Sequence, residues 1–321
     1  MNAWQALIGE HTPYHGGSRD NALALCDHLA VIRVGGEQAG DYLQGQLTCD
    51  LHDIDNGAHH AAMHLSLKGR GLVSLRLARA GDGYLIVCPA AQSAATIKSL
   101  EKYRLRTKVT FTPAEDLLVA GLSGAVETTL TTAGLPCPAA GHALDERDVT
   151  ILRFPHGDLA LLIAPSSTLT QTWPALTEGR RLTDSAGWRF QEITAGEGQI
   201  HPGAEDLFLP QVLNYDVLGG VSFKKGCYTG QEVIARMHFK GKLKQRMALF
   251  AYQGEPLSPG QALRNRDGRA IGDVVDSAPG NPTPRLLAVV RLDHDGELYV
   301  EDQPLQAEPL ALPYSIPTPK G

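Results

Sequence analysis

The feature that most constrains the fold is a hairpin pattern that occurs twice, each time followed by a proline and a helical pattern. The first copy alternates apolar and polar residues over 72–77, turns at 81–83 and returns over 84–88, and the second spans 151–164. Alternation predicts strands, and the spacing after each proline predicts a helix. The sequence therefore predicts an α+β fold with a weak internal duplication. The alternative, that hairpins followed by helices are simply common, stays open.

The pattern of apolar stretches and turn residues changes near residue 245. Short apolar stretches there alternate with Pro, Gly and Asp turns, which predicts a small β-barrel domain. We expect an α+β region over 1–244, built from two intertwined subdomains of about 1–112 and 113–244. The barrel domain then covers 245–321 and ends in a loose proline-rich tail from Leu312. Further strands are expected over 29–34, 63–67 and 109–111, and helices over 37–43, 90–104 and from Pro165 to about residue 177.

Composition and charge narrow the class of protein. The chain has 321 residues, is 43% hydrophobic and 20% charged, and carries a net charge of −6, which argues against whole-surface attraction to nucleic acid or membrane. It has no apolar run long enough to span a bilayer, and the N-terminus lacks the pattern of a secretory signal. The five cysteines are scattered at 26, 49, 88, 137 and 227. No pair has zinc or redox spacing, which predicts free thiols, no metal site and a cytoplasmic location.

The segment KKGCYTGQE, residues 224–232, carries the strongest chemical signal. Thr229 and Glu232 have the spacing of a capping box, which predicts a helix that begins near Gly230. Cys227 is then expected just outside the positive end of this helix, near Lys225 and its neighbouring lysine, where thiolate is favoured over thiol. Cys227 is therefore a candidate reactive thiol, and a packed core cysteine is the alternative.

Positive charge is concentrated around this segment. Between residues 224 and 246 there is one acid, Glu232, against seven basic residues: Lys224, Lys225, Arg236, Lys240, Lys242, Lys244 and Arg246. Such a stretch suits a polyanion, such as a carboxylate-rich tail, a phosphate or an RNA backbone. The alternative is a solvated basic loop. Few aromatic residues interleave, Tyr228 and Phe239, so a dedicated surface for single-stranded RNA is not indicated.

Residues 209–232, which end in KGCYTGQE, resemble the signature of the YgfZ family. These folate-binding proteins are similar to the aminomethyltransferase, or T-protein, of the glycine cleavage system. Residues 43–50 (LQGQLTCD), 67–70 (LKGR) and 102–106 (KYRLR) resemble further family elements. The resemblance covers roughly residues 25 to 300, with the barrel matched mainly by its texture.

The resemblance implies an aminomethyltransferase-like, three-part ring: two mixed α+β parts and a β-barrel around a central folate pocket. It implies tetrahydrofolate or another folate as cofactor, and iron–sulfur client or cluster-carrier proteins as partners. One bacterial client is a cluster-dependent tRNA-modifying enzyme. The sequence departs from the resemblance at His28, where well-known bacterial members have a second tryptophan, and at Thr194, where the family often has a glutamate.

The resemblance also carries over candidate site residues by position. Beside Cys227, the candidate catalytic residues are Lys225, Tyr228, Gln231 and Glu232. Trp188 matches a tryptophan associated with folate, and a pterin is expected to stack on it. The other candidate folate-binding residues are His28, Gln46, Asp50 and Arg236.

Three functions compete on these residues. The leading hypothesis is a folate-binding accessory protein for assembly or repair of iron–sulfur clusters, without classical turnover. The second is a folate-dependent aminomethyltransferase, which needs an acid such as Asp50 near the reacting nitrogen. The third is a tRNA-binding regulatory module that contacts tRNA through residues 224–246.

Overall fold

The computed structural model describes residues 3–9, 11–18 and 21–317. Its contacts group the chain into two compact units, each assembled from separate segments. Unit 1 comprises residues 1–43, 51–60 and 76–191, and unit 2 comprises residues 44–50, 61–75 and 192–321. This grouping does not test the domain boundary expected near residue 245, which stays a prediction.

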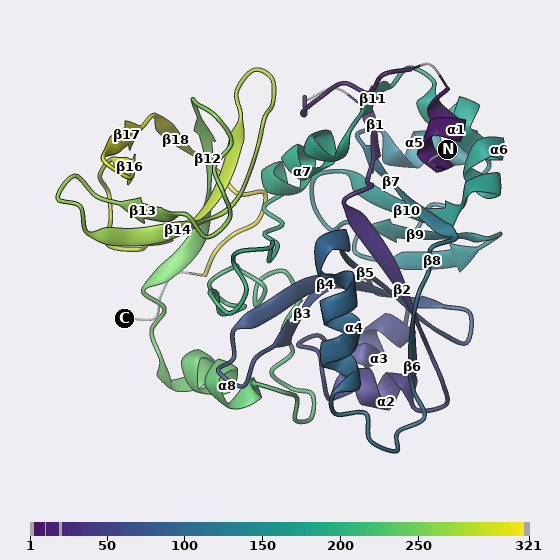
Figure 1. Cartoon of the computed structure of the whole chain (residues 1–321), viewed down its shortest axis with the longest axis horizontal. Coiled ribbons are helices and arrows are strands. Elements are labelled where there is room, and N and C mark those ends of the chain that lie inside the picture. The colour runs from purple at the N-terminus through teal and green to yellow at the C-terminus, as the bar shows by residue number, and fades with distance from the viewer. Residues whose placement is uncertain (1–2, 10, 19–20, 318–321) are drawn as a thin grey trace. The chain divides into compact units, whose positions relative to one another are not determined.

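A six-stranded sheet forms the centre of unit 1 (Figure 1). Its strands, in spatial order, are β11 (Arg181–Thr183), β1 (Ala22–Leu25), β7 (Leu117–Ser123), β10 (Leu159–Pro165), β9 (Val149–Arg153) and β8 (Ala143–Glu146). Strands β9 and β10 pair antiparallel, which confirms the second predicted hairpin. Strand β1 joins this sheet by pairing parallel with β11 and antiparallel with β7.

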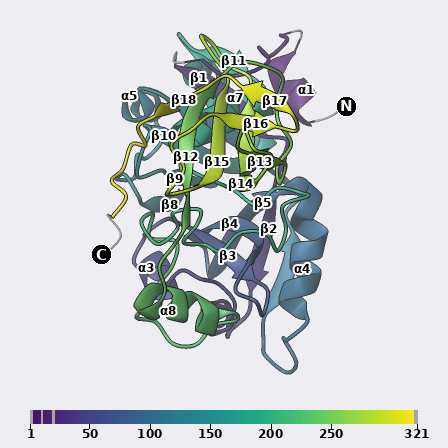
Figure 2. The same ribbon diagram turned by 90° about the vertical axis from the view of Figure 1, so that its left-hand side faces the viewer.

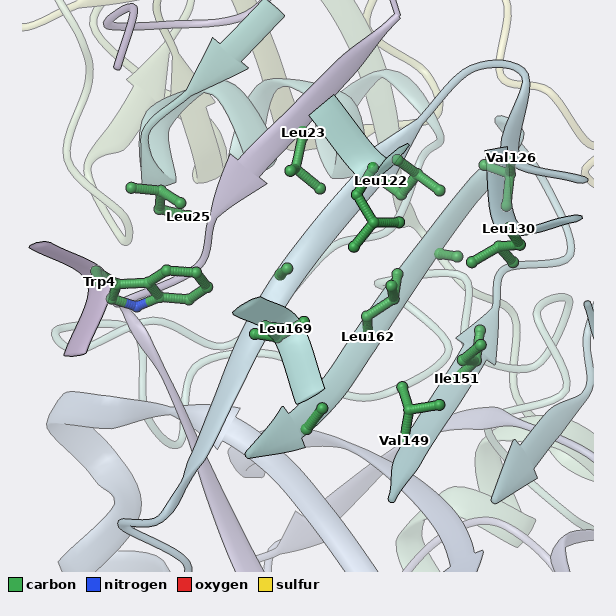
Figure 3. Packing of buried hydrophobic residues seen from close by; sticks show 14 residues of the cluster. Trp4, Leu23, Leu25, Leu122, Val126, Leu130, Val149, Ile151, Leu162 and Leu169 are labelled. Carbon is green, nitrogen blue, oxygen red and sulfur yellow. The ribbon is translucent and has the colours of Figure 1, made fainter. Parts of the chain in front are cut away.

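The main core of unit 1 lies between this sheet and the helices α1 (Ala3–Ile8), α5 (Val126–Thr132) and α6 (Ser166–Thr177). Figure 3 shows Trp4 of α1 and Leu169 of α6 packed with Leu162 of β10 and other apolar side chains of the sheet. Fully burying one such aliphatic side chain contributes about 1.5–3 kcal/mol. The helix after the second hairpin is therefore held by burial of its apolar face, as the pattern predicts.

A five-stranded sheet contains the first predicted hairpin. Its order is β3 (His60–Leu65), β4 (Gly71–Ala80), β5 (Gly83–Pro89), β2 (Leu29–Gly35) and β6 (Thr110–Pro113). The unit boundary falls inside β4, after Leu75. Strands β4 and β5 pair antiparallel around the turn at Gly81, where a positive φ of 52° suits glycine.

The alternating apolar and polar residues of β4 predict one buried face and one exposed face, but its burial does not follow this pattern. All side chains from Val73 to Ala78 are buried, so the strand does not expose one polar face to solvent. Arg76, a polar position of the alternating pattern, lies with its guanidinium 3.9 Å from the ring centroid of Phe154. Arg76 therefore serves an internal contact, whereas Arg79, nearer the turn, is exposed.

Short helices follow or flank the five-stranded sheet in unit 1. These are α2 (Ala39–Gln44), α3 (Leu51–Asp55), the 3-10 turn η1 (Ala90–Gln92) and α4 (Ser93–Glu101). Helix α4 contacts β2 and β6, and Figure 1 shows it running along the sheet. Helix α7 (Ser185–Thr194) follows β11.

Unit 2 contains a nearly closed seven-stranded barrel sheet (Figure 2). Its order is β17 (Gln303–Leu305), β16 (Leu298–Val300), β13 (Ala262–Arg264), β14 (Ala270–Ala278), β15 (Arg285–Arg291), β12 (Gln245–Tyr252) and β18 (Ala307–Leu310). Phe250, Tyr252 and Leu286 belong to its buried core. The barrel predicted from the spacing of apolar stretches and turns is confirmed.

The segment after the barrel is held in place, contrary to the loose tail expected from Leu312 onward. The hydroxyl of Tyr314 donates a hydrogen bond of 2.7 Å to the carbonyl of Gly196 and accepts one of 3.3 Å from the Asn214 side chain. Burial raises the pKa of Tyr314. Residues 318–321 of the expected tail lie outside the described residues. No helix of the described chain has the length and apolarity needed to cross a membrane.

Candidate functional site

Three segments that are far apart in the sequence meet in unit 2. They are residues 44–50, residues 66–71 and the loop 224–230 that leads into helix α8 (Gln231–Lys240). The amide of Thr229 donates a hydrogen bond of 3.1 Å to the carbonyl of Gly45. These three segments contain the motifs QGQLTCD, KGR and KGCYTGQE.

Thr48 ties the first segment to the chain before the loop. Its hydroxyl donates to the carbonyl of Gly220 at 2.6 Å and accepts from the amide of Met63 at 2.9 Å, while its carbonyl accepts from the amide of Ser222 at 2.9 Å. Thr48 is fully buried, so these bonds face little competition from water. The threonine of QGQLTCD therefore has a structural role.

Lys225 fastens the loop to the same segment. Its ammonium donates hydrogen bonds of 2.8 Å to the carbonyl of Leu47 and 2.6 Å to the carbonyl of Cys49, and it lies 4.9 Å from the ring centroid of Tyr228. Only 8% of the residue is exposed. Burial lowers the pKa of Lys225 to about 8, although the nearby Cys49 and Asp50 act to raise it. The sequence predicted that Lys225 supplies positive charge near Cys227. In the structure its ammonium instead links the loop 224–230 to residues 44–50.

Cys227 is exposed, and all five cysteines, each within the described residues, are free thiols. Cys26, Cys49 and Cys88 are buried, and Cys137 is half-buried. Burial raises the pKa of the Cys88 thiol to about 12, which is the behaviour of an inert packed cysteine. The alternative of a packed core cysteine is therefore wrong for Cys227, while its reactivity stays a prediction.

Helix α8 begins where predicted, but its first turn is capped differently. The residue before the helix is Gly230, with a left-handed φ of 82°, and no side chain caps it, so the capping box of Thr229 and Glu232 is wrong. A Cβ atom at Gly230 would lie 2.7 Å from the carbonyl oxygen of Ser66. Glycine is required here by both its conformation and this close approach.

The remaining motif residues differ in exposure. Tyr228 is buried, burial raises its pKa to about 12, and its hydroxyl has no hydrogen-bond partner among the described residues. Gln231 is half-buried and Glu232 exposed on the first turn of α8. The loop thus combines an exposed thiol with a buried phenol.

The candidate folate-binding residues of unit 2 lie on the same two elements. Gln46 has a buried side-chain oxygen without a hydrogen-bond donor in the described part of the chain. Asp50 is half-buried and accepts a hydrogen bond of 2.8 Å from the side chain of Gln44. Arg236 is exposed on α8. Their predicted contact with folate stays a prediction.

Trp188 and His28 belong to unit 1. Trp188 is 0% exposed, with Phe154 edge-on at 5.6 Å between ring centroids. A Cβ atom at Gly121 would clash with the indole, so the ring packs directly against strand β7. Stacking of a pterin on Trp188 stays a prediction, and it requires a neighbour of the ring to move. His28 is half-buried in the turn between β1 and β2.

The structure also assembles a ring cluster that the sequence motifs do not reveal. Phe223 and His238 stack with ring centroids 3.7 Å apart and planes inclined by 18°, and Phe239 packs edge-on against both. The rings come from the loop and from α8, so no spacing rule connects them. Among the residues that the structure describes, no three His, Cys, Asp or Glu side chains gather as metal ligands, and the absence of a metal site stays a prediction.

No protein-family model matches the chain. The tRNA-modifying protein YgfZ of Klebsiella pneumoniae (strain 342) is 32% identical over 283 residues, which cover 87% of this chain and 84% of that protein. The tRNA-modifying protein YgfZ of Escherichia coli O7:K1 is 30% identical over 282 residues, with the same shares covered.

Among solved structures, the glycine cleavage system aminomethyltransferase T from Bartonella henselae matches with a TM-score of 0.73 and 20% sequence identity. The match covers 92% of this chain and 86% of that one. The chain thus has an aminomethyltransferase-like, mixed α+β fold with a nearly closed C-terminal barrel sheet, as expected. At this identity the likeness concerns the fold alone.

Proposed function

The chain belongs to the YgfZ family, and from this premise we propose that it is a folate-binding accessory protein for iron–sulfur clusters. It supports the assembly or repair of clusters in client enzymes, including one that modifies tRNA. The observation that carries the proposal is the exposed thiol of Cys227, which lies on a loop fastened to a second segment by Lys225. A fastened loop presents its thiol in a constant setting.

The loop suits a thiol that acts on a partner. The thiolate is the form of cysteine that binds metal, and the exposed Cys227 lies on the loop just before α8. Common clusters require about four protein thiolates, and the other four cysteines are buried or half-buried. Cys227 therefore contributes one ligand to a cluster that a client or carrier protein also holds.

The folate part of the proposal draws on the fold and on one buried atom. The indole N–H of Trp188 is buried and has no acceptor within the described residues. An unpaired buried donor costs about 1–3 kcal/mol, so an acceptor on a ligand at this position is favourable. Trp188 is the residue proposed to stack on the pterin, and His28, Gln46, Asp50 and Arg236 are further proposed folate-binding residues, with the basic segment that contains Arg236 suited to the glutamate tail. Tetrahydrofolate carries one-carbon units on its reduced pterin.

Complementation tests the function as a whole. The full chain is expressed in a bacterial strain that lacks its own YgfZ protein, and cluster-dependent tRNA modification is measured by mass spectrometry of digested tRNA. We expect modification to rise well above that of the empty-vector strain. Absence of any rise at an equal level of folded protein would refute the proposed function.

Thermal unfolding tests folate binding separately. A ligand at 100 times its Kd stabilises a protein by about 2.7 kcal/mol, so saturating tetrahydrofolate should raise the Tm by several degrees. The Trp188→Phe variant, which lacks the N–H donor, should show a smaller rise than the Trp173→Phe control. An unchanged Tm of the native protein at millimolar folate contradicts the cofactor assignment.

An aminomethyltransferase remains the second candidate because the fold is shared with aminomethyltransferase T. That activity would transfer a one-carbon unit from an aminomethyl-lipoyl carrier protein to tetrahydrofolate. The discriminating assay is formation of methylene-tetrahydrofolate with this carrier. Sustained turnover would replace the accessory role with catalysis, and its absence supports the accessory role.

A further inference from the structure

We propose that residues 223–244, which include helix α8 and the loop before it, form a docking surface for RNA. The surface, called here the basic–aromatic surface, consists of three rings and five cations: Phe223, His238, Phe239, Lys224, Arg236, Lys240, Lys242 and Lys244. It deepens the proposed function, because it assigns a partner to the element that follows the Cys227 loop. All of its residues lie in unit 2.

The rings supply a platform for stacking. His238 lies flat on Phe223, and Phe239 stands nearly perpendicular to His238 with ring centroids 4.8 Å apart. Phe239 is 69% exposed, although it lies in the last turn of a helix whose Ile234 is fully buried. A large exposed aromatic ring next to other rings is a feature of interaction sites, because exposure forfeits the burial that favours folding. Nucleic acid bases stack on such rings regardless of sequence.

The cations of the surface lie in the same stretch of chain as the rings, and all of them are exposed. Lys224, Arg236, Lys240, Lys242 and Lys244 are exposed and have no ion-pair partner among the described residues. Two other basic residues of the segment are excluded because they are already engaged: Lys225 binds two carbonyls and Arg246 is paired with Asp216. One acid, Glu232, opposes them. A chain of net charge −6 therefore concentrates five exposed positive charges within residues 224–244.

Rings and cations together favour RNA over an acidic protein. An acidic polypeptide would neutralise the lysines but would gain nothing specific from the exposed face of Phe239. An unpaired stretch of RNA offers phosphates to the cations and base faces to the ring. The sequence indicated few aromatic residues here because only Tyr228 and Phe239 stand in the basic segment. In the structure Tyr228 is buried and does not belong to the surface, whereas the stacked rings of Phe223 and His238 do.

Fluorescence anisotropy with a labelled, unmodified tRNA transcript tests the proposal on the full chain. Loss of one base–aromatic stack weakens binding about 5- to 150-fold, so Phe239→Ala should fall in this range and Phe239→Tyr should retain binding. The matched control is Leu292→Ala, which removes another exposed apolar side chain from the barrel unit. Because Phe239 is exposed, the variant is expected to keep its fold, and circular dichroism verifies this.

Salt dependence tests the cations. With about 0.7 counterions released per phosphate contact on a single strand, five contacts give a slope of log K against log salt near −3.5. The Lys240→Ala/Lys242→Ala variant should reduce its magnitude by about 1.4, whereas Arg266→Ala/Arg269→Ala, on an exposed barrel turn, should leave it unchanged.

Three results would overturn the proposal: no binding at low salt, equal loss in the Phe239→Ala and Leu292→Ala variants, or equal competition by polyglutamate and RNA at matched charge. The assay contains neither folate nor a client enzyme. Its failure would therefore leave the complementation result intact, and failed complementation would leave a measured RNA surface intact.

Discussion

Replacement of Lys225 by methionine tests the fastening of the thiol loop. The change keeps a long apolar stem and removes the ammonium that donates to the carbonyls of Leu47 and Cys49. Each buried carbonyl left without a donor costs about 1–3 kcal/mol, so the variant loses stability from this source at every pH. Against this, the variant no longer buries a charge.

The pH dependence separates these two effects. Below a pKa of about 8, folded and unfolded chains both carry the proton, and the folded chain bears the full cost of the buried charge. Between about 8 and the ordinary value of 10.5, the folded chain releases the proton first, so the native protein gains stability as pH rises. From pH 7 to 9.5 this gain amounts to about 2 kcal/mol, and Lys225→Met lacks it.

Urea unfolding followed by circular dichroism measures the difference between the two proteins at pH 7, 8, 9 and 9.5. The free energy of unfolding of the native chain, minus that of Lys225→Met, should increase by about 2 kcal/mol from pH 7 to pH 9.5. The control is Lys240→Met, which removes an exposed ammonium from α8. A difference that stays constant or shrinks with rising pH would show that the ammonium of Lys225 is not buried between the two loops.

Further predictions concern the thiol, the glycine before α8 and a buried ion pair. Brief iodoacetamide treatment of the folded protein should label Cys227 ahead of the other four thiols, as read by peptide mass spectrometry; preferential labelling of another cysteine would contradict its exposure. Gly230→Ala should lower the free energy of unfolding by about 2–4 kcal/mol, because its φ of 82° disfavours alanine and the new Cβ would approach the carbonyl oxygen of Ser66 too closely. The control Gly226→Ala places its Cβ in open space and should cost little. Equal effects of the two changes would refute the close approach. Asp216→Ala should cost about 3–5 kcal/mol in urea unfolding, because the largely buried guanidinium of Arg246 loses its carboxylate and keeps only the neutral acceptors of Gln211 and Asn214. A cost below about 1 kcal/mol would contradict that burial.

Local patterns predicted many of the elements but not the pairing of all strands. Both hairpins were predictable because their strands and turns are adjacent in the sequence. The strand β1 is a short apolar run, and nothing in it indicates that Ala22 lies opposite both Arg181 and Ser123. Such long-range pairing depends on the packing of the whole unit and leaves no periodicity in the sequence.

For the candidate site as well, local features were predictable from the sequence and contacts between distant segments were not. The motif indicated a thiol just before a helix, and Cys227 and α8 confirm that arrangement, whereas the exposure of the thiol is known only from the structure. The role of Lys225 was not predictable, because the carbonyls that it binds belong to a distant segment. The stack of Phe223 on His238 was missed for the same reason, since a loop and a helix contribute one ring each.

The central claim is that the YgfZ-family function of this chain depends on the thiol of Cys227. The most direct measurement is cluster-dependent tRNA modification in a strain lacking its own YgfZ protein, with Cys227→Ala compared to the native chain at equal expression. The matched control is Cys137→Ala, which removes a half-buried thiol from unit 1. The account predicts modification near the empty-vector level for Cys227→Ala and near the native level for Cys137→Ala. Full restoration by Cys227→Ala would contradict it.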